Sequence, residues 1–202
     1  MILYGASGHA KVIIDILSKS GQKIDFLVDR DPDTSELLGH KVWEEGTEPI
    51  VEGARSIICI GANKLRKKLT QKLDLNYGRA IHPSATLSEH VHIAEGTVVM
   101  AGAVINSSTS IGEHVIVNTS AVVDHDCEIA DFAHISPNAT LCGNVSVGTG
   151  TMVGAGATII PTIKVGNWAT IGAGAVIIND VPDYAVVVGN PGRIVKYNND
   201  QI

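Results

Sequence analysis

Large aromatic side chains are scarce in this sequence. Only 4% of its 202 residues are Phe, Trp or Tyr, whereas 45% are hydrophobic and 21 are glycine. Aromatic rings normally dominate the packing of globular cores. The composition therefore favours thin, repeated layers of small and aliphatic side chains.

The sequence also lacks the signs of several protein classes. Its 15 Lys and Arg residues form no cluster and the net charge is −6, which argues against nucleic acid or an anionic membrane as a partner. No apolar run approaches the roughly 18 residues of a membrane span, and the N-terminus has no signal-peptide run. Cys59, Cys127 and Cys142 lie in apolar runs without Cys-x-x-Cys spacing, as reduced thiols do. We therefore expect a soluble, cytoplasmic protein without disulfides.

The first 80 residues have the pattern of a small parallel α/β domain. Short apolar runs at 2–4, 24–29 and 57–60 predict buried strands. Aliphatic residues at helical spacing between 7 and 21 predict a helix that ends at Gly21. Residues 63–75 predict a second, amphipathic helix. This β-α-β pattern indicates a Rossmann-like domain over residues 1–80.

From Ile81 onward, an aliphatic residue occupies every sixth position. The pattern runs to Ile177 through seventeen matches without a change of phase, and a small or β-branched residue follows four places after most of them. This hexapeptide repeat predicts a parallel β-helix over residues 81–202. It resembles the left-handed β-helix of hexapeptide acyltransferases, which implies coils of three hexads, or eighteen residues. A purely structural solenoid is the alternative interpretation.

His125 is the candidate general base. It takes the third place of its hexad, which points outward. In coils of eighteen residues it stacks next to Gly143, which would leave open space and bare backbone beside the imidazole. An imidazole with a pKa near ~6.5 can accept a proton at neutral pH. A surface histidine without a function is the alternative.

The types and positions of the residues near His125 indicate how a site around it would be built. Asp126 can orient the ring only if the backbone turns between the two residues, because neighbours in a strand point to opposite sides. The Gly143 N–H is a candidate donor to an oxyanion. His134 lies half a coil away, so the two rings can share a pocket only if two prisms pack side by side, as in a homotrimer. His134 then serves the neighbour's site or helps to hold the interface.

Polar residues and glycines at the ends of the N-terminal strands favour a nucleotide ligand. The loop after the first strand opens a helix whose free amides can bind a diphosphate, although the full G-x-G-x-x-G pattern is absent. Structural turns are the alternative for the glycines alone. The candidates at these strand ends are Gly5, Ser7, Gly8, His9, Asp29, Gly61 and Asn63.

Four segments carry a resemblance to a known family: GASGHAKV from Gly5, IGAN from Ile60, IHPSA from Ile81 and DHDCEIADFAHISPNATLCG from Asp124. They resemble the sugar acetyltransferases of the sialic-acid O-acetyltransferase type, and most closely the UDP-4-amino-sugar N-acetyltransferases of bacillosamine synthesis. The resemblance covers nearly the whole chain. It implies a homotrimer, with acetyl-CoA in the groove between adjacent β-helices and a UDP-sugar held by the N-terminal domain.

The resemblance also implies roles for single residues. His125 would be the general base, Asp126 its acidic neighbour and His134 a second active-site histidine. Gly143 would meet the acetyl group, and His9 would approach the sugar phosphates or the acceptor. The residues that would lie beside the pantetheine and adenine, at the cofactor-binding end of the chain, are Gly154, Ala155, Gly172, Ala173 and Pro191.

We therefore expect an N-acetyltransferase that transfers the acetyl group directly from acetyl-CoA to a nucleotide-linked 4-amino-4,6-dideoxy sugar, with UDP as the expected nucleotide, without an acyl-enzyme and without a metal. Three alternatives remain open for the substrate and activity: O-acetylation of sialic acid or another sugar, N-acetylation of a GDP-amino sugar, and non-catalytic binding of a sugar nucleotide. A zinc-dependent hydratase is a further alternative, and it would need three histidines that converge across a trimer.

Overall fold

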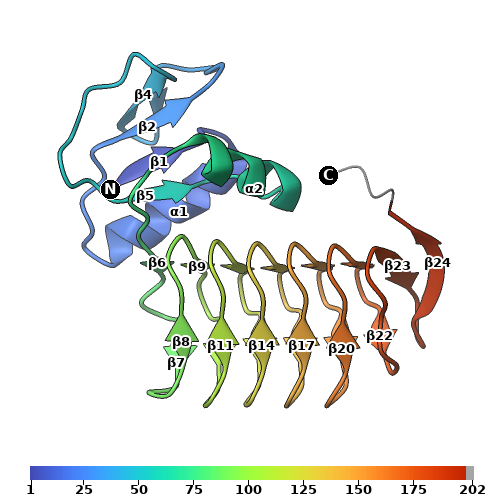
Figure 1. The fold of residues 1–202 in the computed structure, drawn as a ribbon. Helices are drawn as coiled ribbons and strands as arrows, with labels where there is room; N and C mark the ends of the chain where they lie inside the picture. The colour runs from blue at the N-terminus through green and yellow to red at the C-terminus, as the bar shows by residue number, and fades with distance from the viewer. Residues whose placement is uncertain (199–202) are drawn as a thin grey trace.

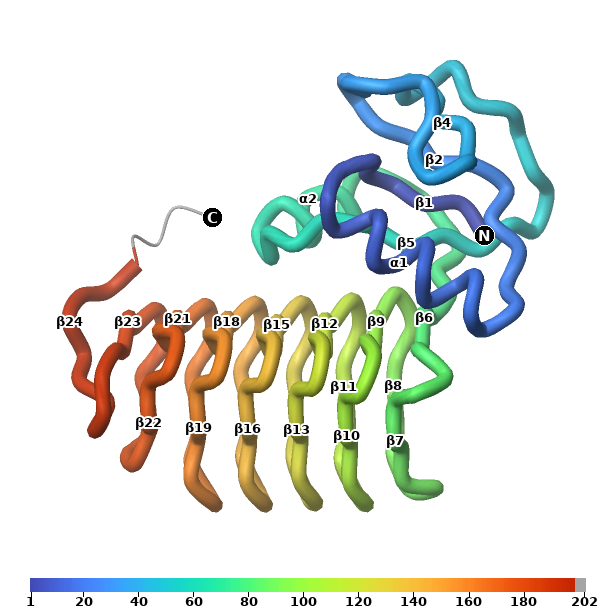
Figure 2. The backbone as a smooth tube through the Cα atoms, turned by 180° about the vertical axis from the view of Figure 1, so that it is seen from behind, coloured from blue at the N-terminus to red at the C-terminus, as the bar shows by residue number. Residues whose placement is uncertain are grey.

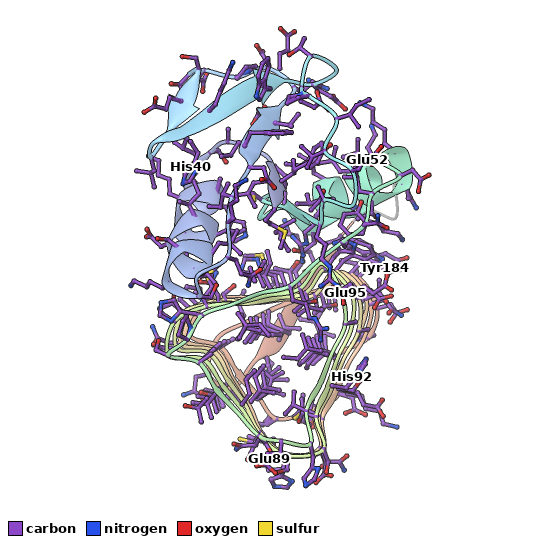
Figure 3. The ribbon with its side chains drawn as sticks, turned by 90° about the vertical axis from the view of Figure 1, so that its left-hand side faces the viewer. His40, Glu52, Glu89, His92, Glu95 and Tyr184 are labelled. Atoms are coloured by element: carbon purple, nitrogen blue, oxygen red, sulfur yellow. The ribbon has the colours of Figure 1, made fainter. Side chains whose placement is uncertain are left out.

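The computed structural model describes residues 1–198, which form a small α/β domain on one side of a long β-helix (Figure 1) that is triangular in cross-section (Figure 3). The α/β domain has a five-stranded sheet of order β3-β4-β2-β1-β5. Its elements are β1 (Ile2–Tyr4), α1 (Gly8–Lys19), β2 (Phe26–Asp29), β3 (Glu36–Leu37), β4 (His40–Glu44), β5 (Ser56–Ile58) and α2 (Asn63–Lys72). The predicted strands and helices are therefore confirmed, and β3 and β4 are additions.

The central strand of this sheet is β1, which pairs in parallel with β2 and β5. All three of its side chains are buried. β2 pairs in parallel with β4, and the short β3 runs antiparallel to β4. Because the carboxyl ends of the parallel strands meet at one edge, the loops after β1, β2 and β5 lie together there.

Each aliphatic residue of the hexapeptide repeat ends a two-residue strand. Strands 18 residues apart pair in parallel, as Val104 does with Val122 and Val122 with Thr140, so the implied coil length is correct. The strands are β6 (Ala80–Ile81), β7 (Thr86–Leu87), β8 (His92–Ile93), β9 (Val98–Val99), β10 (Val104–Ile105), β11 (Ser110–Ile111), β12 (Ile116–Val117), β13 (Val122–Val123), β14 (Glu128–Ile129), β15 (His134–Ile135), β16 (Thr140–Leu141), β17 (Ser146–Val147), β18 (Met152–Val153), β19 (Thr158–Ile159), β20 (Lys164–Val165), β21 (Thr170–Ile171) and β22 (Val176–Ile177).

These strands form three sheets that enclose an aliphatic core (Figure 3). The sheet nearest the α/β domain contains β6, β9, β12, β15, β18 and β21, and it is extended by β23 (Ala185–Val188) and β24 (Arg193–Tyr197). The turns between sheets form three corners. We name them the histidine corner, with His125 and Gly143; the aromatic corner, with His114, Phe132, Gly150 and Trp168; and the alanine corner, with Ala155 and Ala173.

The α/β domain and the β-helix share a hydrophobic core. Side chains from one face of α1, including Ile13 and Leu17, pack in one cluster with Val98, Met100 and Ile116 from the outside of the β-helix. α2 lies over the same side of the prism (Figure 2). The α/β domain is thus fixed against one face, and no helix within residues 1–198 is long and apolar enough to cross a membrane.

Candidate active site

His125 lies in the turn between β13 and β14, where the backbone changes direction. Asp126 has φ +58°, in the left-handed region that Asp tolerates better than most residues. This conformation places Asp126 Oδ2 only 2.7 Å from His125 Nδ1. The hydrogen bond that an orienting role requires is therefore present, and the turn explains why two adjacent side chains meet.

A second carboxylate braces the same turn. Asp124 Oδ1 accepts the His125 N–H at 2.8 Å and the Asn106 amide at 2.8 Å. From inside the β-helix, Thr109 Oγ1 donates to the Asp124 carbonyl at 2.6 Å and accepts the Cys127 N–H at 3.1 Å. The backbone on both sides of His125 is thus held by polar contacts to the coil before it.

The acidic neighbours set the protonation behaviour of His125. The hydrogen bond to Asp126, followed by the charge of Asp124, raises the pKa of His125 above its ordinary value. The side chains of His125 and Asp126 are 59% and 58% exposed. A carboxylate at Nδ1 favours the proton on that nitrogen, which leaves Nε2 as the proton acceptor.

Gly143 does not leave empty space beside the ring, because the imidazole itself fills that space. A Cβ built on Gly143 would lie 2.6 Å from His125 Cε1 and 2.7 Å from Nε2. A side chain at this position would push the ring away. Glycine at position 143 is therefore needed for the position that the ring adopts.

His134 occupies a very different place, on β15 beneath the α/β domain. Its Nε2 lies 3.0 Å from the Asn118 amide, and it makes a backbone hydrogen bond with Gly61. Burial, with the charges of Arg66 and His9, lowers the pKa of His134 to about 4. His134 is therefore neutral at pH 7.

His9, in the first turn of α1, belongs to the same region as His134. Burial, followed by the charge of Arg66, lowers the pKa of His9 to about 4. Its Nε2 is buried and has no hydrogen-bond partner within residues 1–198. The structure thus brings together three of the predicted residues, His9, His134 and Gly61, and it places His125 elsewhere.

The predicted nucleotide residues divide into two groups. Gly5 and Asp29 line a cavity of about 380 Å³ at the carboxyl ends of β1 and β2, against α2. Asp29 Oδ2 accepts the Ala6 N–H at 2.7 Å and so holds the glycine loop. Gly5 has φ +106°, and a Cβ there would lie 3.2 Å from the Cys59 carbonyl oxygen. Five predicted residues do not line the cavity, namely Ser7, Gly8, His9, Gly61 and Asn63.

Three cationic side chains that the sequence analysis did not single out also line this cavity: Arg30, Lys68 and Lys72. Lys68 and Lys72 are four residues apart on α2, so they lie on one face of the helix. That spacing was the signal in the sequence. Lys72 also contacts Glu45 Oε1 at 2.7 Å.

Apart from Gly143, the predicted cofactor residues lie at other turns than His125. Ala155 and Ala173 are exposed at the alanine corner. Gly154 and Gly172 permit close stacking there, because a Cβ on Gly154 would lie 2.6 Å from the Ala173 nitrogen. Pro191 follows a cis peptide bond in the turn between β23 and β24. Their contact with a cofactor stays a prediction.

Comparison with known proteins now defines the family. Residues 1–73 match the PglD N-terminal domain, and residues 126–161 match the bacterial transferase hexapeptide repeats. The solved structure of PerB from Caulobacter crescentus, in complex with CoA and GDP-perosamine, is 39% identical, with a TM-score of 0.91 over 96% of each chain. The chain belongs to this family of hexapeptide-repeat sugar N-acetyltransferases.

Other members of the sugar N-acetyltransferase family agree with this assignment. The acetyltransferase domain of PglB from Neisseria gonorrhoeae, in complex with acetyl coenzyme A, is 36% identical, with a TM-score of 0.88 over 96% of this chain and 98% of that one. UDP-N-acetylbacillosamine N-acetyltransferase from Bacillus subtilis is 40% identical over 108 residues. That match spans 48% of this chain and 49% of the Bacillus protein.

Proposed function

We propose that this protein transfers the acetyl group of acetyl-CoA to the amine of a nucleotide-linked 4-amino-4,6-dideoxy sugar, with His125 as the general base. The observation that carries the proposal is the hydrogen bond between His125 Nδ1 and Asp126, 2.7 Å long, on an exposed corner of the β-helix. It is supported by the family members whose solved structures hold CoA with GDP-perosamine, or acetyl coenzyme A.

The proposed chemistry is direct transfer. His125 Nε2 takes a proton from the acceptor amine as its nitrogen attacks the thioester carbon. The N–C bond forms, the C–S bond breaks, and the thiolate of CoA leaves with the proton returned by the imidazolium. The Gly143 N–H makes no hydrogen bond within residues 1–198, so it is the proposed donor to the transient oxyanion.

The cavity of the α/β domain is the proposed nucleotide site. Arg30, Lys68 and Lys72 offer positive charge to phosphates, and Gly5 allows close approach of the backbone. Asp29 and Asp31 offer carboxylate acceptors to the N–H groups of a base or the hydroxyls of a ribose. Both UDP and GDP fit this description, so the base is left to the assay.

A second copy of the chain is needed to complete the proposed site. Figure 3 shows Glu89 at the vertex farthest from the α/β domain. His125 lies at the same corner, two coils later along the prism. A sugar held by the α/β domain therefore cannot reach His125 of its own chain. In a homotrimer, the histidine corner of one prism can face His134 and the nucleotide cavity of its neighbour.

The proposal is tested by thiol release from acetyl-CoA with UDP- and GDP-linked 4-amino sugars, with mass spectrometry of the product. We expect thiol release with one nucleotide series and an N-acetylated product. Release only with sialic acid or another hydroxyl acceptor would replace the amine in the proposal. Tight nucleotide-sugar binding without any thiol release would indicate a non-catalytic binding protein.

A further inference from the structure

Arg66 is a buried cation that the proposed mechanism does not use. It lies on α2, is only 1% exposed and is the largest fully buried side chain within residues 1–198. Among residues 1–198, no carboxylate forms an ion pair with it. Burial lowers its pKa to about 10. A buried charge without a counter-ion is costly, so its partners must offset the loss of hydration.

Four of those partners are backbone carbonyls from separate parts of the chain. Nε donates to the His114 carbonyl and Nη2 to the Phe132 carbonyl, each at 2.8 Å. Nη1 donates to Ile60 at 2.9 Å and to Gly61 at 3.3 Å. The planar guanidinium therefore joins two coils of the β-helix to the loop between β5 and α2.

The carbonyls of the aromatic corner form a column that side chains bind one after another. After His114 and Phe132, the carbonyl of Gly150 accepts the Asn63 amide at 3.0 Å. Asn63 Oδ1 in turn accepts from Arg66 Nη2 at 2.9 Å. One coil further, the Trp168 carbonyl accepts the Asn198 amide at 3.0 Å. Four successive coils are thus bound, three of them by α2.

This arrangement fixes the position of α2 along the prism. Asn63 and Arg66 are three residues apart, so they lie on one face of the helix. Their rise of roughly 4.5 Å is comparable to the ~4.8 Å between stacked strands. A cation–π contact also joins α2 to the aromatic corner, since Lys67 Nζ lies 5.2 Å from the Trp168 ring centroid. A carbonyl recurs at this corner in every coil, so Arg66 and Asn63 hold α2 against the corner, while the contact with Trp168, a side chain present in one coil, distinguishes this register from the next.

Two parts of the proposed site depend on this contact. Gly61, whose carbonyl Arg66 binds, also makes the backbone hydrogen bond to His134. α2 forms one wall of the nucleotide cavity, through Leu65, Lys68 and Lys72. Any movement of Arg66 would therefore shift both His134's partner and the cavity wall relative to the β-helix.

We infer that Arg66 and Asn63 are positioning residues that fix the register of the α/β domain on the β-helix and so deliver the nucleotide-linked acceptor to the acetyl-transfer site. This inference rests on the proposed function. It gives Asn63 a role other than the predicted nucleotide contact, because both ends of its amide are already bonded. A nucleotide contact by Asn63 stays a prediction from the sequence.

The test compares Arg66→Lys, Arg66→Met and Asn63→Ala with Lys11→Met, which removes an exposed cation from α1. Loss of charge-assisted hydrogen bonds should raise KM for the acceptor by about tenfold or more in the Arg66 variants. KM for acetyl-CoA should change by less than about twofold, because none of the predicted cofactor residues lies on α2. A purely structural residue would instead lower kcat with the folded fraction and leave both KM values unchanged, which would overturn the inference.

Hydrogen exchange provides a readout that does not need activity. Arg66→Lys and Asn63→Ala should speed amide exchange in α2 and in residues 60–63 while the coils from β13 to β17 keep their protection. If Arg66→Met does not fold, these two variants still decide the matter. If these variants leave amide exchange in α2 unchanged while the wild-type chain acetylates an amino sugar, the inference is contradicted and the proposed function stands. A wild-type chain without activity would instead refute the proposed function.

Discussion

His125 and His134 are nine residues apart in one regular repeat, yet they lie in opposite environments. His125 is exposed beside two carboxylates, which raise its pKa. His134 is buried beneath the α/β domain near Arg66 and His9, and its pKa falls to about 4. Half a coil separates them, so they lie on different sides of the prism. The comparison shows that position around the coil decides whether a histidine can exchange protons at neutral pH.

The largest expected effect comes from removing the exposed histidine. His125→Ala should lower kcat by about a hundredfold or more, within the range that general-base catalysis supplies. His90→Ala is a matched control, because His90 is exposed at the same corner two coils earlier. Thiol release from acetyl-CoA measures both. Equal activity in the two variants would mean that the base lies elsewhere.

A side chain at position 143 should displace the ring without removing it. In Gly143→Ala, the new Cβ would lie within 2.7 Å of His125 Nε2 unless the imidazole moves. We expect kcat to fall by about tenfold or more, because a misplaced base loses its alignment with the acceptor. Far-UV circular dichroism should show a folded β-helix. Full activity would show that the observed ring position is not the reactive one.

The carboxylate beside His125 should set the pH profile. The His125 imidazole can accept a proton only when it is unprotonated in the free enzyme. The value of kcat/KM should therefore rise with pH through the raised pKa of His125. Asp126→Asn removes the largest cause of that rise, so its midpoint should move to lower pH. We also expect a lower plateau, by about tenfold, because a less basic imidazole accepts protons less readily. An unshifted midpoint would contradict the assigned pair.

The buried histidines should affect stability and not the pH profile of catalysis. The pKa values of His9, His114 and His134 are lowered to about 4, whereas unfolded histidines titrate near ~6.5. The unfolded chain binds more protons in this window, so stability should fall as pH drops from about 6.5 to 4. Thermal unfolding measures this loss.

A variant at the aromatic corner isolates one of these three titrations. His114 is 3% exposed and stacks on Phe132 with ring centroids 5.3 Å apart. His114→Phe keeps the stacking and removes the proton site, so the acid-induced loss should shrink by about a third. The charge of Asp131 raises the pKa of His114 and so offsets part of the lowering by burial. Asp131 remains in the variant. An unchanged acid dependence would show that His114 is not among the groups that titrate.

The smallest effect should come from the cysteines. Cys127 is buried and points into the β-helix, and its pKa is raised by burial. Cys127→Ala with Cys142→Ser should leave kcat within about twofold of the wild type, because direct transfer needs no thiol nucleophile. A loss of several orders of magnitude, with the fold retained, would indicate an acyl-enzyme instead.

Much of this fold could be predicted because the hexapeptide repeat is regular. Ile81 to Ile177 fixed the phase, and stacking of residues 18 apart placed Gly143 beside His125. The contact between His125 and Asp126 could not be derived, since it depends on the left-handed φ of Asp126. The sequence also hid the role of Arg66, because an arginine on an amphipathic helix normally faces solvent.

One signal for the domain contact was nevertheless present. His114, Phe132 and Trp168 recur at multiples of 18 residues in a chain with few aromatic residues, and they meet α2 at one corner. Two contacts show why geometry was still needed. The side chains of Arg66 and Asn63 bind backbone carbonyls, and backbone groups carry no residue-specific pattern that a sequence could reveal.

The most direct test of the proposed site between subunits is complementation. His125→Ala chains and His134→Ala chains are each expected to have low activity. In mixed trimers, a site that takes His125 from one chain and His134 from its neighbour will sometimes receive both intact histidines. We predict that co-refolded mixtures recover a substantial fraction of wild-type thiol release. Mixed trimers, verified by native mass spectrometry, that stay as inactive as the separate variants would contradict a site built across subunits.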